Sequence, residues 1–391
     1  MYHNDMRRHA ARSLFAVGAL SAYAASAISG RPALRKGGLL LACLMATLPT
    51  ATFSCSAFLV SSRNAAILGR TLDWDYGHGV ILVNPRGLKK RALLGPPDQP
   101  AQWTSKYGSV TFNQVGREFP YGGVNEKGLD VEQLWLGSAR FPAPDSRPAL
   151  NELQWIQYQL DNFASVSEVL ANLKKTNVVS RIAPIHYFIC DASGACAAVE
   201  GIAGKLVVHK GRSLPIRALT NDTYSDSLSY SKRFLVSRDT SGLPAGTKSL
   251  ARFARLGYLL ASRRAPAEGS IEGAFAKLSD VSSPKSDGDD GATQWRIVQD
   301  LKGKTIYFET LKDSTEKAID LSRIDFSCAK PAQALDVDIQ ASGNVNSRFA
   351  DYTMSQNSDL VGRSLSTGFA HLSPETIRKI AEYPGSFVCG K

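Results

Sequence analysis

The chain from residue 55 onwards has the hydrophobic pattern of a strand-rich protein. Runs of this length and composition, separated by turn-forming residues, predict β-strands. Only Arg63 and Asn64 separate the first two runs, so we expect these strands to form a hairpin within a larger sheet. The first four runs of β-branched, aromatic and aliphatic residues occupy positions 56–62, 65–74, 79–87 and 128–136.

The middle of the chain predicts two neighbouring helices. Residues 150–163, after Pro148, space their apolar side chains three and four positions apart, as one buried helix face requires. Ser165 followed by Glu168 is the capping-box pattern that begins a second helix. The same periodicity predicts a third helix over residues 249–264.

Strands and helices occur in separate runs rather than in alternation. This segregation predicts an α+β protein with stacked layers and argues against an alternating parallel-sheet fold. Residues 331–391 have weaker periodicity, and we expect them to be an accessory C-terminal tail after a domain over residues 55–330. The later strands are expected at 186–190, 195–201, 204–211, 293–301 and 305–311.

The charge of the chain does not indicate a nucleic-acid partner. The formal net charge is +11 over 391 residues, but six basic residues and one acidic residue lie within 1–54. That segment therefore contributes +5 of the net charge of +11. In the remainder the basic residues are scattered, with no basic run and no interleaved aromatic track, which is typical of a solvated surface.

Residues 1–54 resemble a targeting or pro segment. Arg7-Arg8 and Arg35-Lys36 each precede a short apolar run, and neither run reaches the ~18 residues that a membrane span requires. We therefore expect an exported protein, periplasmic or secreted, cut after Ser54 and without a stable membrane span in its mature form. A buried pair of N-terminal helices is the structural alternative.

The cysteines fit an oxidising compartment. Either Cys190 with Cys196 or Cys328 with Cys389 could form a disulfide, and the second pair is preferred because it would anchor the tail. Cys43 would leave with the leader, so Cys55 is the unpaired thiol.

Cys55 becomes the first residue if the chain is cut after Ser54. It would then carry a thiol of pKa ~8.5 and an α-amine of pKa ~7.7–8.0 on one residue. The amine can take the thiol proton, so that a thiolate attacks an amide carbonyl. Arg70 can stabilise the thiolate, and Asp73 can accept a hydrogen bond from the amine. Because these two residues are three positions apart, both reach the thiol only if the strand turns or bulges near Thr71 and Leu72.

Several motifs of this sequence resemble those of the choloylglycine hydrolase family, which includes bile salt hydrolases and penicillin V acylases. The resemblance covers about residues 55–315. It implies a four-layered αββα sandwich of the N-terminal-nucleophile hydrolases, hydrolysis of a linear amide C–N bond, and no metal or organic cofactor. The motifs are Cys55-Ser56, GRTLDW at 69–74, GGVNEKGL at 122–129, LTND at 219–222, ARFAR at 251–255 and TQWRIVQDLKGKTIYF at 293–308.

The resemblance also implies a set of site residues. Cys55 would be the nucleophile, Asn125 an oxyanion donor, and Asn221 an assistant in the oxyanion hole. Arg252 would be the late arginine of the site, although Arg255, one helical turn later, competes for that role. The complete set is Cys55, Arg70, Asp73, Asn125, Asn221 and Arg252.

The expected partner is a small-molecule N-acyl amide substrate, and a homo-oligomer is compatible with the sequence. Penicillin V and N-acyl homoserine lactones are the preferred substrate classes, with conjugated bile salts as the alternative. Two rival interpretations remain: a lipid-anchored, non-catalytic binding protein acylated at Cys43, and a secreted scaffold that uses Cys55 in a disulfide. Apolar residues that could line an acyl pocket are Phe58, Trp74, Tyr76, Leu134 and Trp135.

Overall fold

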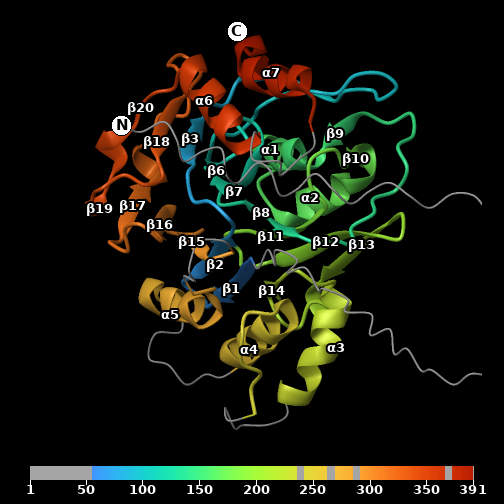
Figure 1. Ribbon diagram of the computed structural model, residues 1–391, viewed down its shortest axis with the longest axis vertical. Coiled ribbons are helices and arrows are strands. Elements are labelled where there is room, and N and C mark those ends of the chain that lie inside the picture. Colours follow the sequence, from blue (N-terminus) through green and yellow to red (C-terminus); the bar gives the residue numbers. More distant parts are fainter. Residues whose placement is uncertain (1–54, 236–241, 262–268, 285–290, 366–371, 391) are drawn as a thin grey trace, which may run out of the picture. The chain divides into compact units, whose positions relative to one another are not determined.

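Two large, mostly antiparallel β-sheets lie face to face in this protein (Figure 1). We describe them from a computed structural model that covers residues 55–390, with gaps at 236–241, 262–268, 285–290 and 366–371. The predicted leader, residues 1–54, lies outside the described residues and stays a prediction. A buried ion pair between Arg70 of one sheet and Glu132 of the other joins the two inner faces.

The first sheet has seven strands and contains the predicted N-terminal hairpin of β1 and β2. In this hairpin Ser56 pairs with Thr71 at one end, and Ser61 pairs with Ala66 at the turn. Its long central strands are buried because both faces are covered. In spatial order the strands are β14 (Ala218–Leu219), β1 (Ser56–Ser61), β2 (Ala66–Asp73), β15 (Thr293–Asp300), β16 (Thr305–Thr310), β17 (Lys317–Asp320) and β19 (Gly343–Asn344).

The second sheet has nine strands, and the sequence pattern did not predict four of them, β6, β7, β18 and β20. In spatial order the strands are β13 (Lys205–Lys210), β12 (Cys196–Ile202), β11 (Ile185–Cys190), β8 (Asp130–Trp135), β7 (Pro120–Asn125), β6 (Ser109–Asn113), β3 (Val80–Asn84), β18 (Gln333–Asp336) and β20 (Ala350–Asp351). Smaller sheets pair β9 (Ala149–Asn151) with β10 (Asn177–Val179), and β4 (Leu88–Arg91) with β5 (Gln102–Thr104) and β21 (Val388–Cys389).

Helices cover the outer face of each sheet, which gives the predicted αββα arrangement. Helix α1 (Glu152–Asn162) packs on β7 and β8, and α2 (Val166–Asn172) follows it. On the other side, α4 (Ser249–Ala261) packs on β1, α5 (Ile271–Val281) packs on β2 and β15, and α3 (Tyr224–Leu235) packs on α4. No helix within the described ranges is long and apolar enough to cross a membrane.

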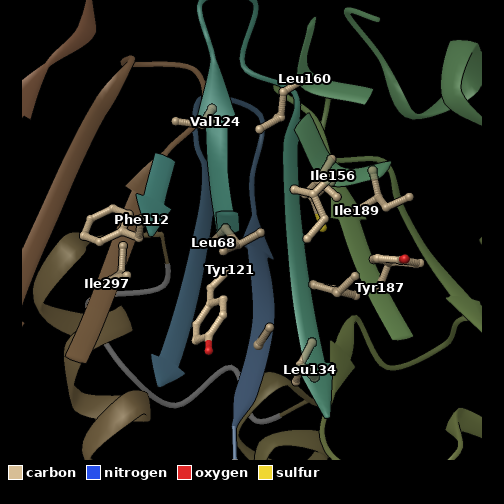
Figure 2. Close-up of a cluster of buried hydrophobic side chains, with 14 of the residues drawn as sticks. Leu68, Phe112, Tyr121, Val124, Leu134, Ile156, Leu160, Tyr187, Ile189 and Ile297 are labelled. Atoms are coloured by element: carbon tan, nitrogen blue, oxygen red, sulfur yellow. The ribbon is translucent and has the colours of Figure 1, made fainter. Parts of the chain in front are cut away.

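The apolar core fills the layers between these elements (Figure 2). Ile156 and Leu160 of α1 are fully buried, as expected for the periodic apolar positions of this helix. Ser165 caps α2 by accepting from the Glu168 backbone, as predicted, but the Glu168 carboxylate binds the Ala164 N–H rather than that of Ser165. The helix start was therefore predicted correctly, with a different partner for Glu168.

The C-terminal segment is part of the same sheets rather than an appendage. Strand β18 pairs with β3 in the nine-stranded sheet, and β21 pairs with β4. The segment also holds α6 (Met354–Leu365) and α7 (Pro374–Glu382). Both disulfides considered above form: Cys190–Cys196 joins β11 to β12, and Cys328–Cys389 fixes the last strand. The preferred anchor of the predicted accessory tail, the Cys328–Cys389 disulfide, is therefore present.

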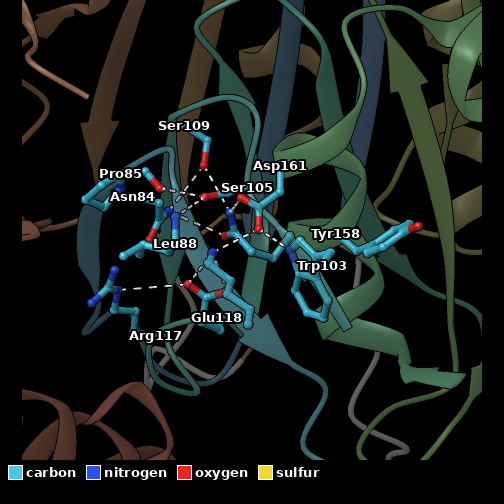
Figure 3. A network of polar contacts seen from close by, with 12 residues as sticks. Asn84, Pro85, Leu88, Trp103, Ser105, Ser109, Arg117, Glu118, Tyr158 and Asp161 are labelled. Carbon is cyan, nitrogen blue, oxygen red and sulfur yellow. Dashed lines mark hydrogen bonds and ion pairs between the residues drawn. The ribbon is translucent and has the colours of Figure 1, made fainter. Parts of the chain in front are cut away.

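A buried polar cluster lies beside β4, the strand with which the C-terminal strand β21 pairs (Figure 3). Lys90 Nζ lies 2.8 Å from Glu118 Oε2 and 2.9 Å from Asp161 Oδ2. The indole N–H of Trp103 also donates to Asp161. Phe387, near the C-terminus, lies over the Lys90 ammonium at 5.6 Å, so the final residues help to seal these charges from water.

Candidate active site

Cys55 lies directly before β1, next to the end of β2. It is a free thiol and is 2% exposed. The neighbouring Ser56 donates its backbone N–H to Thr71 Oγ1 at 3.0 Å, which holds the start of β1 against β2. The other described cysteines pair with one another, so none of them is available for the Cys55 disulfide of a secreted scaffold.

Asp73 ends strand β2 and is fully buried. Its Oδ1 accepts a hydrogen bond from Thr293 Oγ1 at 2.5 Å, whereas Oδ2 is buried and has no hydrogen-bond partner among the described residues. Burial raises the pKa of Asp73 to about 7, although Arg252 and the hydroxyls of Thr293 and Thr71 lower it. This carboxyl group can therefore accept one more donor.

A β-bulge lies beside the end of β2, but in the neighbouring strand β15 rather than in β2 itself. Leu72 pairs with Trp295 and Asp73 pairs with Thr293, so Gln294 of β15 is the extra residue of a β-bulge. The Gln294 amide donates to the Trp74 carbonyl at 2.9 Å. We predicted a bulge within β2 near Thr71 and Leu72, and the structure places the additional residue in the partner strand.

Arg70 is buried between the two sheets. Its Nη1 lies 2.9 Å from Glu132 Oε2, and its Nη2 donates to the Gln133 carbonyl at 3.5 Å. Burial raises the pKa of Glu132 to about 7, and Arg70 opposes this shift. Glu132 was missed by the sequence analysis, although an acidic residue inside the predicted buried strand 128–136 was an available signal.

Arg252 of α4 is the arginine that reaches Cys55. Its Nη1 donates to the Cys55 carbonyl oxygen at 2.6 Å and to Ser56 Oγ, and its Nη2 donates to Asn221 Oδ1 at 2.8 Å. Burial lowers the pKa of Arg252 to about 10. Arg255 instead donates to the backbone carbonyls of other residues, including Pro244 and Asp280, so it is not the site arginine.

Asn221 joins the site through the loop before α3. Its Nδ2 donates to the Trp135 carbonyl at 2.9 Å, and its backbone N–H donates to Ser249 Oγ at 2.8 Å. With its Oδ1 bound to Arg252, the side chain is held between β8 and α4. The structure thus brings Asn221 and Arg252 to Cys55, Arg70 and Asp73.

Asn125 does not have the role that we expected from the sequence. Both hydrogens of its amide are donated to backbone carbonyls, those of Leu160 at 2.8 Å and Phe163 at 2.7 Å. Its Oδ1 accepts from the backbone N–H groups of Lys127 and Leu129. An oxyanion donor needs a free N–H group. The assignment is therefore corrected: Asn125 connects β7 to the end of α1.

The Cys55 thiol is held neutral in the unprocessed chain. Burial is the largest influence and raises its pKa, and the Asp73 carboxylate raises it further. Arg70, Arg252 and a hydrogen bond from the Asp73 backbone N–H act in the opposite direction. A base is therefore needed to form the thiolate, and two cations are in place to stabilise it.

Aromatic side chains lie next to Asp73 at the end of β2. The ring of Trp74 lies 6.2 Å from each of Tyr76, Tyr121 and Trp135, measured between centroids. Phe58, which we had considered for an acyl pocket, instead packs within the hairpin: a Cβ atom on Gly69 would lie 2.5 Å from its ring. Within the described ranges, no three His, Cys, Asp or Glu side chains gather to bind a metal ion.

Comparison with known proteins agrees with this geometry. The fold is that of the N-terminal-nucleophile hydrolases, and the solved structure of penicillin V acylase from Agrobacterium tumefaciens superposes with a TM-score of 0.68 and 31% identity, over 76% of this chain and 98% of that one. Residues 55–334 match the linear amide C–N hydrolases of the choloylglycine hydrolase family. The chain belongs to this family.

Two curated relatives illustrate the range of the family. The penicillin V acylase of Pectobacterium atrosepticum is 28% identical over 298 residues, which are 67% of this chain and 78% of that protein. A bile salt hydrolase/transferase of Bifidobacterium longum is 26% identical over 218 residues, which are 49% of this chain and 68% of that protein. The chain is thus a linear amide hydrolase similar to penicillin V acylases and bile salt hydrolases.

Proposed function

We propose that the processed chain begins at Cys55 and is an exported amidohydrolase that cleaves an N-acyl compound. The observation that carries this proposal is the unpartnered Asp73 Oδ2 beside the only free thiol of the described residues. Cleavage of the peptide bond between Ser54 and Cys55 would create an α-amine on Cys55. Asp73 could accept a hydrogen bond from this amine. The base that the thiol requires is then on the same residue.

The reaction proceeds through an acyl-enzyme. The α-amine takes the proton of the Cys55 thiol, and the thiolate attacks the amide carbon to form a C–S bond. The carbonyl electron pair moves to oxygen, then returns as the C–N bond breaks and the leaving nitrogen takes the proton. Water, deprotonated by the amine, then attacks the thioester carbon; the C–S bond breaks, the sulfur takes the proton back from the amine, and a carboxylic acid is released. Arg70 stabilises the thiolate, and Asp73 orients the amine.

Arg252 and Asn221 hold the nucleophile and its surroundings in place. Arg252 binds the Cys55 carbonyl and Asn221, so it fixes the first residue of the processed chain relative to α4. Asn221 carries a side-chain amide near the same point and is proposed to assist in binding the oxyanion. Buried, prearranged donors of this kind typically contribute ~2.7–4 kcal/mol of transition-state stabilisation each.

The substrate is proposed to be an aryl- or alkyl-acyl amide of the penicillin V or N-acyl homoserine lactone type. Trp74, Tyr76 and Trp135 offer flat apolar surfaces suited to such an acyl group. The likeness to two penicillin V acylases supports this preference. Conjugated bile salts are the alternative, supported by the similarity to bile salt hydrolases.

The test combines N-terminal analysis with a substrate panel. Intact mass of the exported protein is expected to place Cys55 first, and Cys55→Ser is expected to fold but lose nearly all turnover. Penicillin V or acyl homoserine lactones are expected to be cleaved faster than glycine-conjugated bile acids. A diacylated Cys43 ahead of an internal Cys55, or full turnover in Cys55→Ser, would contradict the mechanism.

A further inference from the structure

Tyr121 is placed near the reactive residues by a second β-bulge. On strand β7, Gly122 pairs with Phe112 and Pro120 pairs with Asn113, so Tyr121 is the extra residue. A bulged residue turns toward a face that regular alternation would not give it. Tyr121 consequently lies 6.2 Å from Trp74, the residue that follows Asp73, in an edge-to-face arrangement of the two rings. Figure 2 shows its ring among the buried side chains of the sheets.

The hydroxyl of Tyr121 is buried and has no hydrogen-bond partner among the described residues. The residue is 2% exposed, so the hydroxyl is not hydrogen-bonded to bulk water. Buried hydroxyl groups without a partner are uncommon, because desolvation costs about 1–3 kcal/mol when no hydrogen bond replaces the contact with water. In this protein the orphaned hydroxyl belongs to a ring that packs against Trp74, next in sequence to Asp73.

The electrostatic surroundings keep this hydroxyl protonated. Burial raises the pKa of Tyr121 well above its ordinary value, and the nearby Tyr76 and Cys55 raise it further, whereas Arg70 lowers it. Cys55 and Arg70 are thus among the charged groups that act on the phenol. Tyr121 is therefore a neutral donor at every pH at which the enzyme would work.

We propose that the Tyr121 hydroxyl is a catalytic donor that hydrogen-bonds the substrate carbonyl oxygen as Cys55 attacks it. This inference rests on the proposed function, in which Cys55 is the nucleophile. When the C–S bond forms, the carbonyl electron pair moves to oxygen, and Tyr121 stabilises that charge without losing its proton. Tyr121 thus takes the oxyanion-binding role that the bonded amide of Asn125 cannot fill.

The test is Tyr121→Phe, which removes one oxygen atom and preserves the packing. Loss of an oxyanion donor is expected to lower kcat about 10²–10³-fold with KM nearly unchanged. Loss of an unpartnered buried hydroxyl is expected to leave Tm unchanged or to raise it. Activity and stability therefore move in different directions, which a purely structural tyrosine would not produce.

Tyr187→Phe is the matched control. Tyr187 is also a buried tyrosine of the nine-stranded sheet, but its hydroxyl donates to the Glu152 carbonyl at 2.8 Å. This variant is expected to lose stability and to retain kcat. A normal kcat in Tyr121→Phe, a change confined to KM, or a lower Tm would each overturn the proposal. Cys55→Ser, measured in parallel, separates the cases, because full turnover in that variant would refute the nucleophile itself.

Discussion

At the scale of single residues, the site is defined by polar atoms that the fold buries without partners. Asp73 Oδ2, Arg70 Nε and the Tyr121 hydroxyl all belong to this group. Elsewhere in the protein, buried side chains such as Asn125 and Tyr187 use their hydrogen-bonding groups fully. Buried polar groups without a partner also occur elsewhere among the described residues, for example Asn84 Oδ1 and Gln154 Nε2, so it is the proximity of these three to Cys55 that gives them a proposed role.

The pH dependence of stability provides a test of Asp73. Its pKa is about 7 in the folded, unprocessed chain, compared with ~3.9 in an unfolded chain. The folded state therefore binds more protons between these values, so this group makes the unfolding free energy fall as pH rises from about 4 to about 7. Asp73→Asn is expected to flatten this fall, measured by urea denaturation at a series of pH values.

Asp325→Asn is a suitable control for that experiment. Asp325 is exposed, and hydrogen bonds from Ser327 lower the pKa of its carboxyl group, so its effect on stability has the opposite sign. An unchanged pH profile in Asp73→Asn would mean that this carboxyl group is already ionised in the fold. The measurement should use an unprocessed chain, because an α-amine on Cys55 would itself lower the pKa of Asp73.

The sequence predicted most of the side chains that gather at Cys55 but not their closest contacts. Cys55, Arg70 and Asp73 lie near one another in sequence, so a hairpin alone brings them together. Thr293 was missed because it meets Asp73 across 220 positions of sequence. Asn125 was misassigned because a motif places a residue in a turn but does not show which atoms its amide binds.

At the scale of elements, Asn125 connects a strand to a helix. Asn125→Ala removes two donors to the end of α1 and the acceptor for two backbone N–H groups. Because these groups are buried or partly buried, we expect destabilisation by about 2–4 kcal/mol with kcat per folded molecule retained. Urea unfolding and active-site titration test this together. A large fall in kcat at unchanged stability would restore the oxyanion role.

The elements that the sequence predicted well are those whose apolar residues recur with a clear helix or strand period. Helices α1 and α4 and strands β1, β2, β8, β15 and β16 lie close to the expected ranges. Strand β7 was missed because its sequence, PYGGVN, contains two glycines and a proline, which normally disfavour strands. Gly122 is required there, since a Cβ atom would lie 1.8 Å from Glu132 Oε2. The glycine that made the strand hard to predict thus provides the space for the Glu132 carboxylate beside Arg70.

At the scale of the whole molecule, the C-terminal segment completes the domain. The family match ends at residue 334, yet β18 spans Gln333–Asp336 and extends the nine-stranded sheet beyond β3. Arg117 stacks on Phe387 and Tyr352, which both lie after the matched region. Residues outside the shared family region thus cover a buried part of the shared fold.

Loss of the Cys328–Cys389 disulfide tests how strongly this segment stabilises the protein. The bond links residues 61 positions apart, so it restricts the unfolded chain considerably. Cys389→Ser is expected to lower the unfolding free energy by about 2–4 kcal/mol. Cys196→Ser opens a loop of only 6 positions and should cost less by this effect. Equal stabilities of Cys389→Ser and the parent protein under oxidising conditions would contradict the anchoring role.

The two bulges also have a consequence for the comparison of relatives. Gln294 and Tyr121 are each one residue more than the partner strand requires. A homologue that lacked either residue could keep the same strand pairs and the same faces for the paired side chains, but it would lose the bulged side chain itself and the local twist that aims it. A gap of one position in these strands can therefore signal a change of chemistry that percentage identity barely registers.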